Sequence, residues 1–242
     1  MMPNKCNINQ SKIISYSERG IMDAIVFTIG QSTGKVTEFL RDCLKVNILK
    51  SYDDVSSYDL YLEHSLSEFG TPDLVIIVHY KDQSSDVIFI EAKVCSGKNK
   101  WECAVPLDQF DKKNADASNL FYQLYLKALL FQRKRDNFPI KDYKAVSRSI
   151  GKNIVVSKFF NAIKDCSYAY YAALVPSLMP DGDDNDKIVV DLKDEDPTLS
   201  FDVKLINWET IDSFYKDSEP FIRDAFEHNK GLIYMDSSAS NH

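Results

Sequence analysis

The chain has 242 residues, and its formal net charge is −7. Its length and its hydrophobic content of 44 % permit a complete core in one domain or in one domain with an appendage. No run of about eighteen apolar residues occurs and residues 1–20 lack an apolar block, so we expect a cytoplasmic protein with no membrane-spanning helix, signal peptide or membrane partner. The five cysteines form no CxxC pair and do not cluster with the four histidines, which argues against a zinc site or a disulfide framework.

The N-terminal half predicts two helices followed by two strands. Apolar residues recur at helical spacing in 17–30 and in 33–52. The segments 73–80 and 87–94 are rich in β-branched residues and flank a polar turn, which predicts an antiparallel hairpin. Folding it about the middle of the turn gives paired residue numbers that sum to about 167, so Asp73 is expected opposite residue 93 or 94.

The C-terminal half predicts a helix at 119–136, a buried strand at 168–177, a strand passing into a helix at 201–215, and a helix at 219–229. This order predicts an α/β fold with a mixed central β-sheet flanked by helices. We expect one domain over residues 1–230 and a mobile C-terminal tail at 231–242.

Charge is distributed unevenly along the chain. Residues 127–164 hold ten basic and two acidic residues, a local charge of +8, whereas residues 181–227 hold five basic and fifteen acidic residues, a local charge of −10. The basic segment fits a polyanionic partner, although a solvated helix face would have the same composition.

The ends of the predicted hairpin carry the residues that indicate chemistry. Glu91 and Lys93 are two positions apart and leave the same face of a strand, and the expected pairing brings Asp73 to the same patch. Clustered carboxylates repel each other unless a cation bridges them, and Mg²⁺ needs only one or two carboxylates with a backbone carbonyl, here that of Ala92. Lys93 would stand beside a metal-bound water. The alternative is a salt bridge from Lys93 to Asp73 or Glu91 at a strand end.

The residues Pro72, Asp73, Glu91, Ala92 and Lys93, on consecutive strands, resemble the motif of the PD-(D/E)XK nuclease superfamily. The resemblance covers roughly residues 15 to 215, with its specific motif at 70–94. It implies a restriction-endonuclease-like αβββαβ core and a nuclease that depends on Mg²⁺ or Mn²⁺. Asp73 and Glu91 would hold the metal and Lys93 would position or activate water.

The same resemblance implies a further acid on an N-terminal helix. Glu18 matches it as a catalytic and metal-binding residue, and Arg19 beside it would contact phosphate. The alternative for Glu18 is an exposed first-turn acid favoured by the helix dipole.

Several branches of the superfamily place a Gln on the helix after the ExK strand, often with Tyr four positions later. This chain offers Gln123, but Lys127 stands where that Tyr would be. Gln123 is therefore either a substrate-binding residue or a helix-surface amide, and Arg133, Lys134 and Arg135 are expected to bind substrate phosphates.

The predicted function is that of a metal-dependent nuclease whose partner is nucleic acid, DNA rather than RNA. The alternative is a catalytically unused nuclease fold that acts as a nucleic-acid-binding or assembly module. Homo-oligomer formation stays open. The chain has no GxGxxG, GxxxxGK or Ser-His-Asp pattern that favours a small-molecule enzyme.

Overall fold

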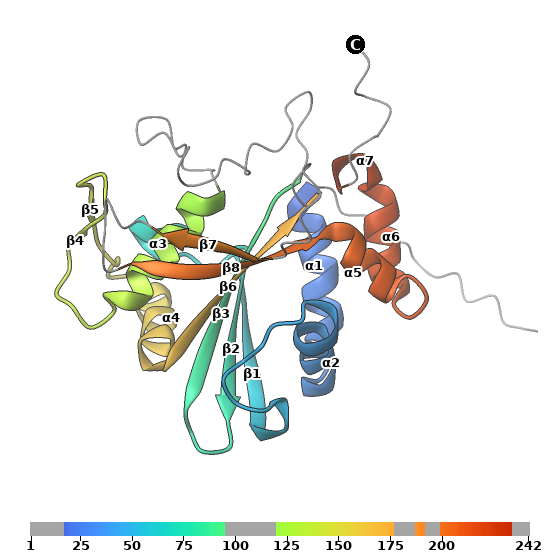
Figure 1. Ribbon diagram of the computed structural model, residues 1–242, viewed down its shortest axis with the longest axis horizontal. Coiled ribbons are helices and arrows are strands. Elements are labelled where there is room, and N and C mark those ends of the chain that lie inside the picture. The colour runs from blue at the N-terminus through green and yellow to red at the C-terminus, as the bar shows by residue number, and fades with distance from the viewer. Residues whose placement is uncertain (1–16, 95–119, 177–186, 192–198, 234–242) are drawn as a thin grey trace, which may run out of the picture.

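The computed structural model describes residues 17–94, 120–176, 187–191 and 199–233, and shows a mixed six-stranded sheet between two layers of helices (Figure 1). The strands are β1 (Val55–Leu62), β2 (Leu74–Tyr80), β3 (Ser85–Ala92), β6 (Tyr168–Val175), β7 (Lys187–Asp191) and β8 (Ser200–Asn207), in the order β1-β2-β3-β6-β8-β7, and β4 (Ile140–Lys141) with β5 (Ser147–Arg148) forms a separate hairpin. The helices are α1 (Ser17–Ile29), α2 (Thr33–Glu38), α3 (Leu120–Gln132), α4 (Ile154–Asp165), α5 (Trp208–Tyr215), α6 (Pro220–His228) and α7 (Lys230–Ile233).

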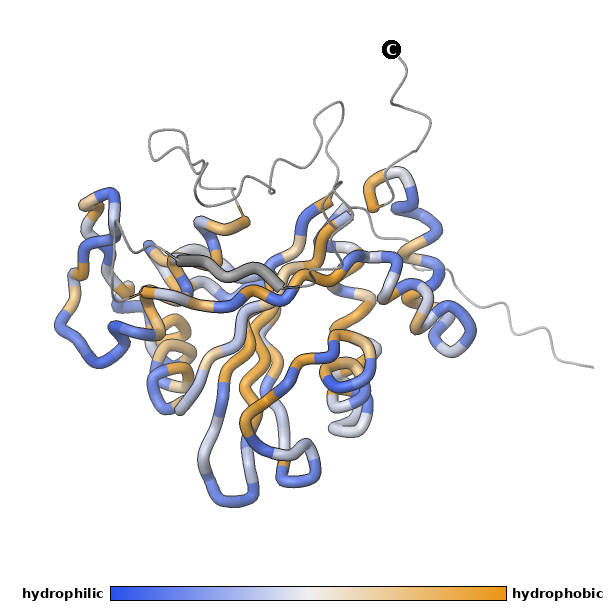
Figure 2. The backbone as a smooth tube through the Cα atoms, in the orientation of Figure 1, coloured by the Kyte–Doolittle hydropathy of each residue, from blue (hydrophilic) through white to orange (hydrophobic). Residues whose placement is uncertain are grey.

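Each face of the sheet packs against its own group of helices. Alternate residues of β2 and β3, such as Val75 and Phe89, belong to a core with α3 and α4, while their neighbours, such as Leu74 and Ile90, belong to a core with α1, α5 and α6. Figure 2 shows the hydrophobic residues concentrated along the central strands and the hydrophilic ones in the outer turns. Burial on both faces explains why β2 and β3 read as continuous apolar runs.

The predicted antiparallel pairing of β2 with β3 is confirmed, but its predicted register is wrong. Leu74 pairs with Ile90 and His79 with Ser85, so paired numbers sum to 164. The strands continue closer to the turn than expected: the Tyr80 N–H donates to the Ser84 carbonyl at 2.9 Å, and Gln83 adopts φ 69°. Extending the ladder by one pair places Asp73 level with Glu91, not with residue 93 or 94.

Several elements differ from the sequence-based expectation. The second predicted helix, 33–52, is shorter: α2 ends at Glu38 and continues only as a π-helical turn over Phe39–Cys43. The chain also forms α4, β1 and β7, which the apolar pattern did not predict. Helix α4 begins with a β-branched run at 154–156, which is more typical of a strand. Asn153 caps this helix, and its side chain accepts a hydrogen bond from the Val155 N–H. In β1 the exposed edge position gives a polar sequence.

The C-terminal part is ordered past the predicted domain end at residue 230. Helix α7 extends to Ile233, whose side chain is completely buried. The rest of the predicted tail, 234–242, lies outside the described residues, as does the polar segment 95–118. Among the described residues, no helix combines the length and apolarity needed to cross a bilayer.

The packing of β3 against β6 gives a stability prediction. Phe89 is fully buried, and its ring stacks on Tyr171 with centroids 5.7 Å apart and an angle of 9°. We expect Phe89→Ala to lower the free energy of unfolding by about 3–5 kcal/mol, because it leaves a cavity in the core. Urea denaturation measures this. The matched control is Phe27→Ala, since Phe27 is 66 % exposed and should change the same quantity by less than about 0.5 kcal/mol. Equal effects would contradict this packing.

Candidate active site

The candidate site lies where β2 begins, β3 ends and α1 begins. Asp73 precedes the Leu74–Ile90 pair and Glu91 follows it, so the two carboxylates face each other across adjacent strands. By strand alternation both are on the face that Val75 and Phe89 bury against α3.

Asp73 is held by the backbone of the neighbouring strand. Its Oδ2 atom accepts a hydrogen bond from the Ala92 N–H at 2.6 Å. The pKa of the Asp73 carboxyl is raised to about 8, mainly by burial and then by the carboxylates of Glu91 and Glu18, while the Ala92 N–H and Lys93 oppose the rise. Like charges crowded in a poorly solvated place disfavour ionisation, and a bound cation would remove that penalty.

Glu91 is almost completely buried and lies beside a lysine of α3. Its Oε1 atom is 2.7 Å from Lys127 Nζ, and the two side chains are 1 % and 0 % exposed. The distance is that of an ion pair, but the angles are not those of a hydrogen bond, and neither oxygen of Glu91 has a hydrogen-bond donor among the described residues. The carboxylate therefore keeps lone pairs directed at the site.

Lys93 follows the end of β3, and its main chain is fixed on both sides. Its N–H donates to the Leu174 carbonyl of β6 at 2.8 Å, and its own carbonyl accepts from Trp208 Nε1 at 2.8 Å. Trp208 is completely buried. The charge of Lys93 opposes the rise in the pKa values of both Asp73 and Glu18, so Lys93 is within electrostatic range of both carboxyls.

Glu18 reaches the same place from the first turn of α1. Burial raises the pKa of Glu18, Lys93 opposes this, and Glu91 raises it further. Glu18 is thus a partly buried acid within electrostatic range of the other three residues, and not the fully exposed first-turn acid of the alternative interpretation.

A second group of charges, not predicted from the sequence, adjoins Glu18. Glu63 follows β1; its N–H donates to the Asp73 carbonyl at 3.1 Å and its carboxylate pairs with Arg19. Arg19, expected to contact phosphate, is therefore already bound to an acid. Burial raises the pKa of Asp23, and Glu63 raises it further. The position of Glu63 after a strand adjacent to β2 was the available signal, and it was missed because β1 was not recognised.

The carboxylates fit a hard divalent cation in kind but do not form a closed cage. Among the described residues, no three acidic, histidine or cysteine side chains already meet as a metal-binding group. Mg²⁺ retains several waters and is commonly held by only one or two carboxylates, and Asp73 and Glu91 supply these. Ala92 acts as a hydrogen-bond donor here, and the role of its carbonyl as a ligand stays a prediction.

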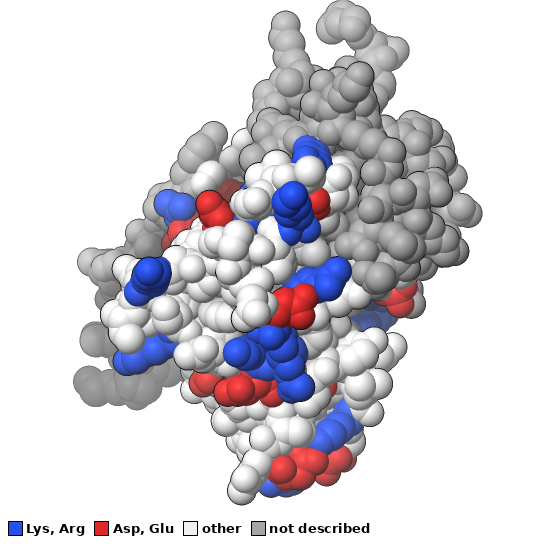
Figure 3. Space-filling view, turned by 90° about the vertical axis from the view of Figure 1, so that its left-hand side faces the viewer, with Lys and Arg blue, Asp and Glu red and all other residues white. Residues whose placement is uncertain are grey.

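The basic residues at the end of α3 do not flank this site. Lys134 is 8 % exposed, and its ammonium donates to the Cys166 carbonyl just before β6 begins. Glu91 pairs with Ala173 near the end of β6. Ala173 is five residues after the start of β6 at Tyr168, which is roughly 17 Å along the strand at 3.3 Å per residue. Arg133 pairs with Asp136. On the side of the molecule seen in Figure 3, basic and acidic side chains alternate and form no continuous positive surface.

A cavity beside the site places Gln123 and three cations together. It has a volume of about 440 Å³ and is lined by Gly70, Gln123, Lys127, Lys144 and Arg148, among others. Gln123 Oε1 is buried and accepts no hydrogen bond within the described part of the chain. Gln123 therefore lines this cavity next to Lys127, and its part in substrate binding stays a prediction.

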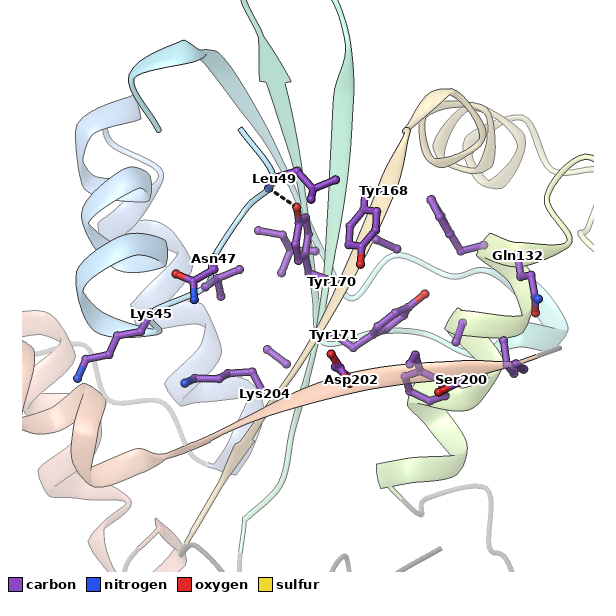
Figure 4. A pocket seen from close by; sticks show the side chains of 18 residues that line it. Lys45, Asn47, Leu49, Gln132, Tyr168, Tyr170, Tyr171, Ser200, Asp202 and Lys204 are labelled. Carbon is purple, nitrogen blue, oxygen red and sulfur yellow. Dashed lines mark hydrogen bonds between the residues drawn. The ribbon is translucent and has the colours of Figure 1, made fainter. Parts of the chain in front are cut away.

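A larger cavity, of about 780 Å³, lies elsewhere in the sheet. Figure 4 shows it between β6 and β8, which diverge before their first pair, Tyr171 with Val203. Tyr168, Tyr170 and Lys204 line it, and the Tyr170 hydroxyl accepts from the Leu49 N–H at 2.6 Å. None of the clustered carboxylates lines it, so its size alone does not make it the reactive site.

No family model matches the sequence, and no curated protein or solved structure matches the chain. A functional assignment therefore depends on the residues of the site itself.

The raised pKa of Asp73 gives a prediction about stability without divalent ions. Between about pH 4 and pH 8 the folded protein keeps this proton, while the unfolded chain releases it, so the free energy of unfolding falls as pH rises, by up to about 1.4 kcal/mol per pH unit. We expect Asp73→Asn to remove this contribution and flatten the dependence. Urea denaturation in EDTA at several pH values measures it, with exposed Asp54→Asn as the control. An unchanged slope in Asp73→Asn would contradict the assignment.

Proposed function

We propose that the protein is a metal-dependent nuclease that hydrolyses phosphodiester bonds of nucleic acid, with DNA preferred over RNA. The observation that carries the proposal is the strand register, which sets Asp73 level with Glu91 at one end of the sheet, with Glu18 and Lys93 within electrostatic range of Asp73. A strand-end salt bridge does not account for it, because the cation 2.7 Å from Glu91 is Lys127 of α3, not Lys93.

The order of elements supports a restriction-endonuclease-like core. Along the chain, α1 is followed by β1, β2 and β3, then by α3 and by β6, which is the αβββαβ order that the resemblance implies. The acid of α1 lies within electrostatic range of the acids at the ends of β2 and β3, which supports this assignment. The α4 and β4–β5 elements between α3 and β6 would be additions to this core.

The residues divide the chemistry between them. Asp73 and Glu91 would hold a divalent ion, with Glu18 sharing it directly or through water; when bound, such an ion polarises a phosphoryl oxygen and lowers the pKa of water. Lys93 directs an ammonium into the same space, where it orients the attacking water or stabilises charge on the phosphate. The two backbone hydrogen bonds of Lys93 keep its position fixed relative to both carboxylates.

Substrate contacts are reassigned by the geometry. Arg19, Arg133 and Lys134 are engaged with other groups, and the end of α3 lies away from the carboxylates. Lys144 and Gln123 line the cavity next to Lys127 and are better placed to meet a substrate that enters there.

The proposal predicts cleavage that requires Mg²⁺ or Mn²⁺ and is abolished by EDTA, measured on labelled duplex DNA, single-stranded DNA and RNA. Lys93→Ala should lower the cleavage rate roughly 10²- to 10⁴-fold while leaving most of the nucleic-acid binding, because Lys93 acts at the scissile phosphate. Lys216→Ala, which removes an exposed lysine of the C-terminal layer, is the matched control.

The outcomes separate this function from its alternative. Salt-sensitive binding without cleavage under any metal condition would indicate a nucleic-acid-binding module that keeps the fold without the activity. Absence of both binding and cleavage would reject both functions.

A further inference from the structure

The ion pair between Glu91 and Lys127 has no evident purpose as a source of stability. Both side chains are at most 1 % exposed, and the surrounding α3 residues Leu124, Ala128 and Leu130 are apolar and buried. Two charges removed from water lose hydration that their attraction only partly restores, so a well-packed apolar pair is usually at least as stable. A buried lysine directly on a carboxylate of the candidate site therefore calls for a functional explanation.

The ammonium of Lys127 is confined to its place beside Glu91. The backbone approaches it at Gly70, where φ is 86° and a Cβ would lie 3.1 Å from Nζ. The cavity next to it is lined also by Lys144 and Arg148, whose charges repel an ammonium. Glu68 also lines this cavity, but its carboxylate accepts a hydrogen bond from the Ser149 N–H, and the acid that Lys127 pairs with is Glu91. We therefore expect Lys127 to stay on Glu91 when another cation enters the site.

We propose that Lys127 occupies the position of a second metal ion, so that the site takes one divalent cation per chain; this inference rests on the nuclease function proposed above. In two-metal sites a carboxylate commonly bridges ions about 3.5–4 Å apart. Here an ammonium already lies 2.7 Å from one oxygen of Glu91, which leaves the other oxygen for a single ion shared with Asp73.

The charges agree with this arrangement. Glu18, Asp73 and Glu91 contribute −3 when ionised, and Lys93 and Lys127 contribute +2. One divalent ion brings the site to +1, which a single phosphodiester neutralises, whereas two ions would leave +3 before substrate binds. Repulsion from Lys127 thus acts against a second ion where the dielectric constant is low.

Counting bound Mn²⁺ on the purified full chain, by equilibrium dialysis and by the electron paramagnetic resonance signal of free Mn²⁺, tests the proposal. We expect one ion per chain in the wild type, two in Lys127→Met, which keeps an unbranched side chain one atom shorter and removes the charge, and one in Lys127→Arg, which keeps the charge. Lys127→Gln is a second neutral variant, and cooperative urea unfolding shows that each variant is folded.

Two ions in the wild type, or one ion in both folded neutral variants, would overturn the role of Lys127 while leaving a metal-dependent nuclease intact. If no neutral variant folds, the wild-type count decides alone. No ion bound to the wild type, together with no cleavage in the parallel assay, would instead remove the nuclease function and this inference with it.

Discussion

The antiparallel pairing of β2 with β3 is the constraint on which the site depends. Because side chains alternate across a strand, the pair Leu74–Ile90 fixes the face on which Asp73 and Glu91 lie, and a shift by one residue would move one of them to the opposite core. The flanking residues are fully buried on both faces, so such a shift would also move apolar side chains from one core to the other. The packing that holds the sheet together is therefore what keeps two repelling carboxylates side by side.

Sequence patterns predicted the elements that carry a long apolar run or a clear helical repeat of apolar residues. The hairpin, α1, α3 and β6 belong to these and were located closely. The edge strand β1, where Ser and Asp interrupt the apolar residues, and α4, which has a β-branched start, were missed although both pack against a core. The acids on β2 and β3 were identifiable because a short motif placed them, and Glu63 was missed with its strand.

Contacts between distant segments were beyond the reach of the sequence. The ten basic residues of 127–164 are close in sequence, but the fold separates them. Lys127 is buried against Glu91, Lys134 donates to the Cys166 carbonyl, and Arg148 pairs with Asp142. The charge counted along the sequence gives the number of cations in a segment, whereas the packing of the fold determines which of them face solvent. Lys127 stands where the resembled superfamily often has Tyr, four residues after Gln123. The sequence alone gave no role for this lysine, and its contact with Glu91 suggests one.

The hydrogen bond from Trp208 to the Lys93 carbonyl spans 115 residues of sequence. Its consequence concerns synthesis. A nascent chain that has emerged from the ribosome as far as β6 contains every acid of the site and its lysine, yet lacks the indole that holds the end of β3. The final arrangement of Lys93 therefore waits until the translating ribosome has released α5, and a fragment truncated before residue 208 carries the charged groups without this anchor.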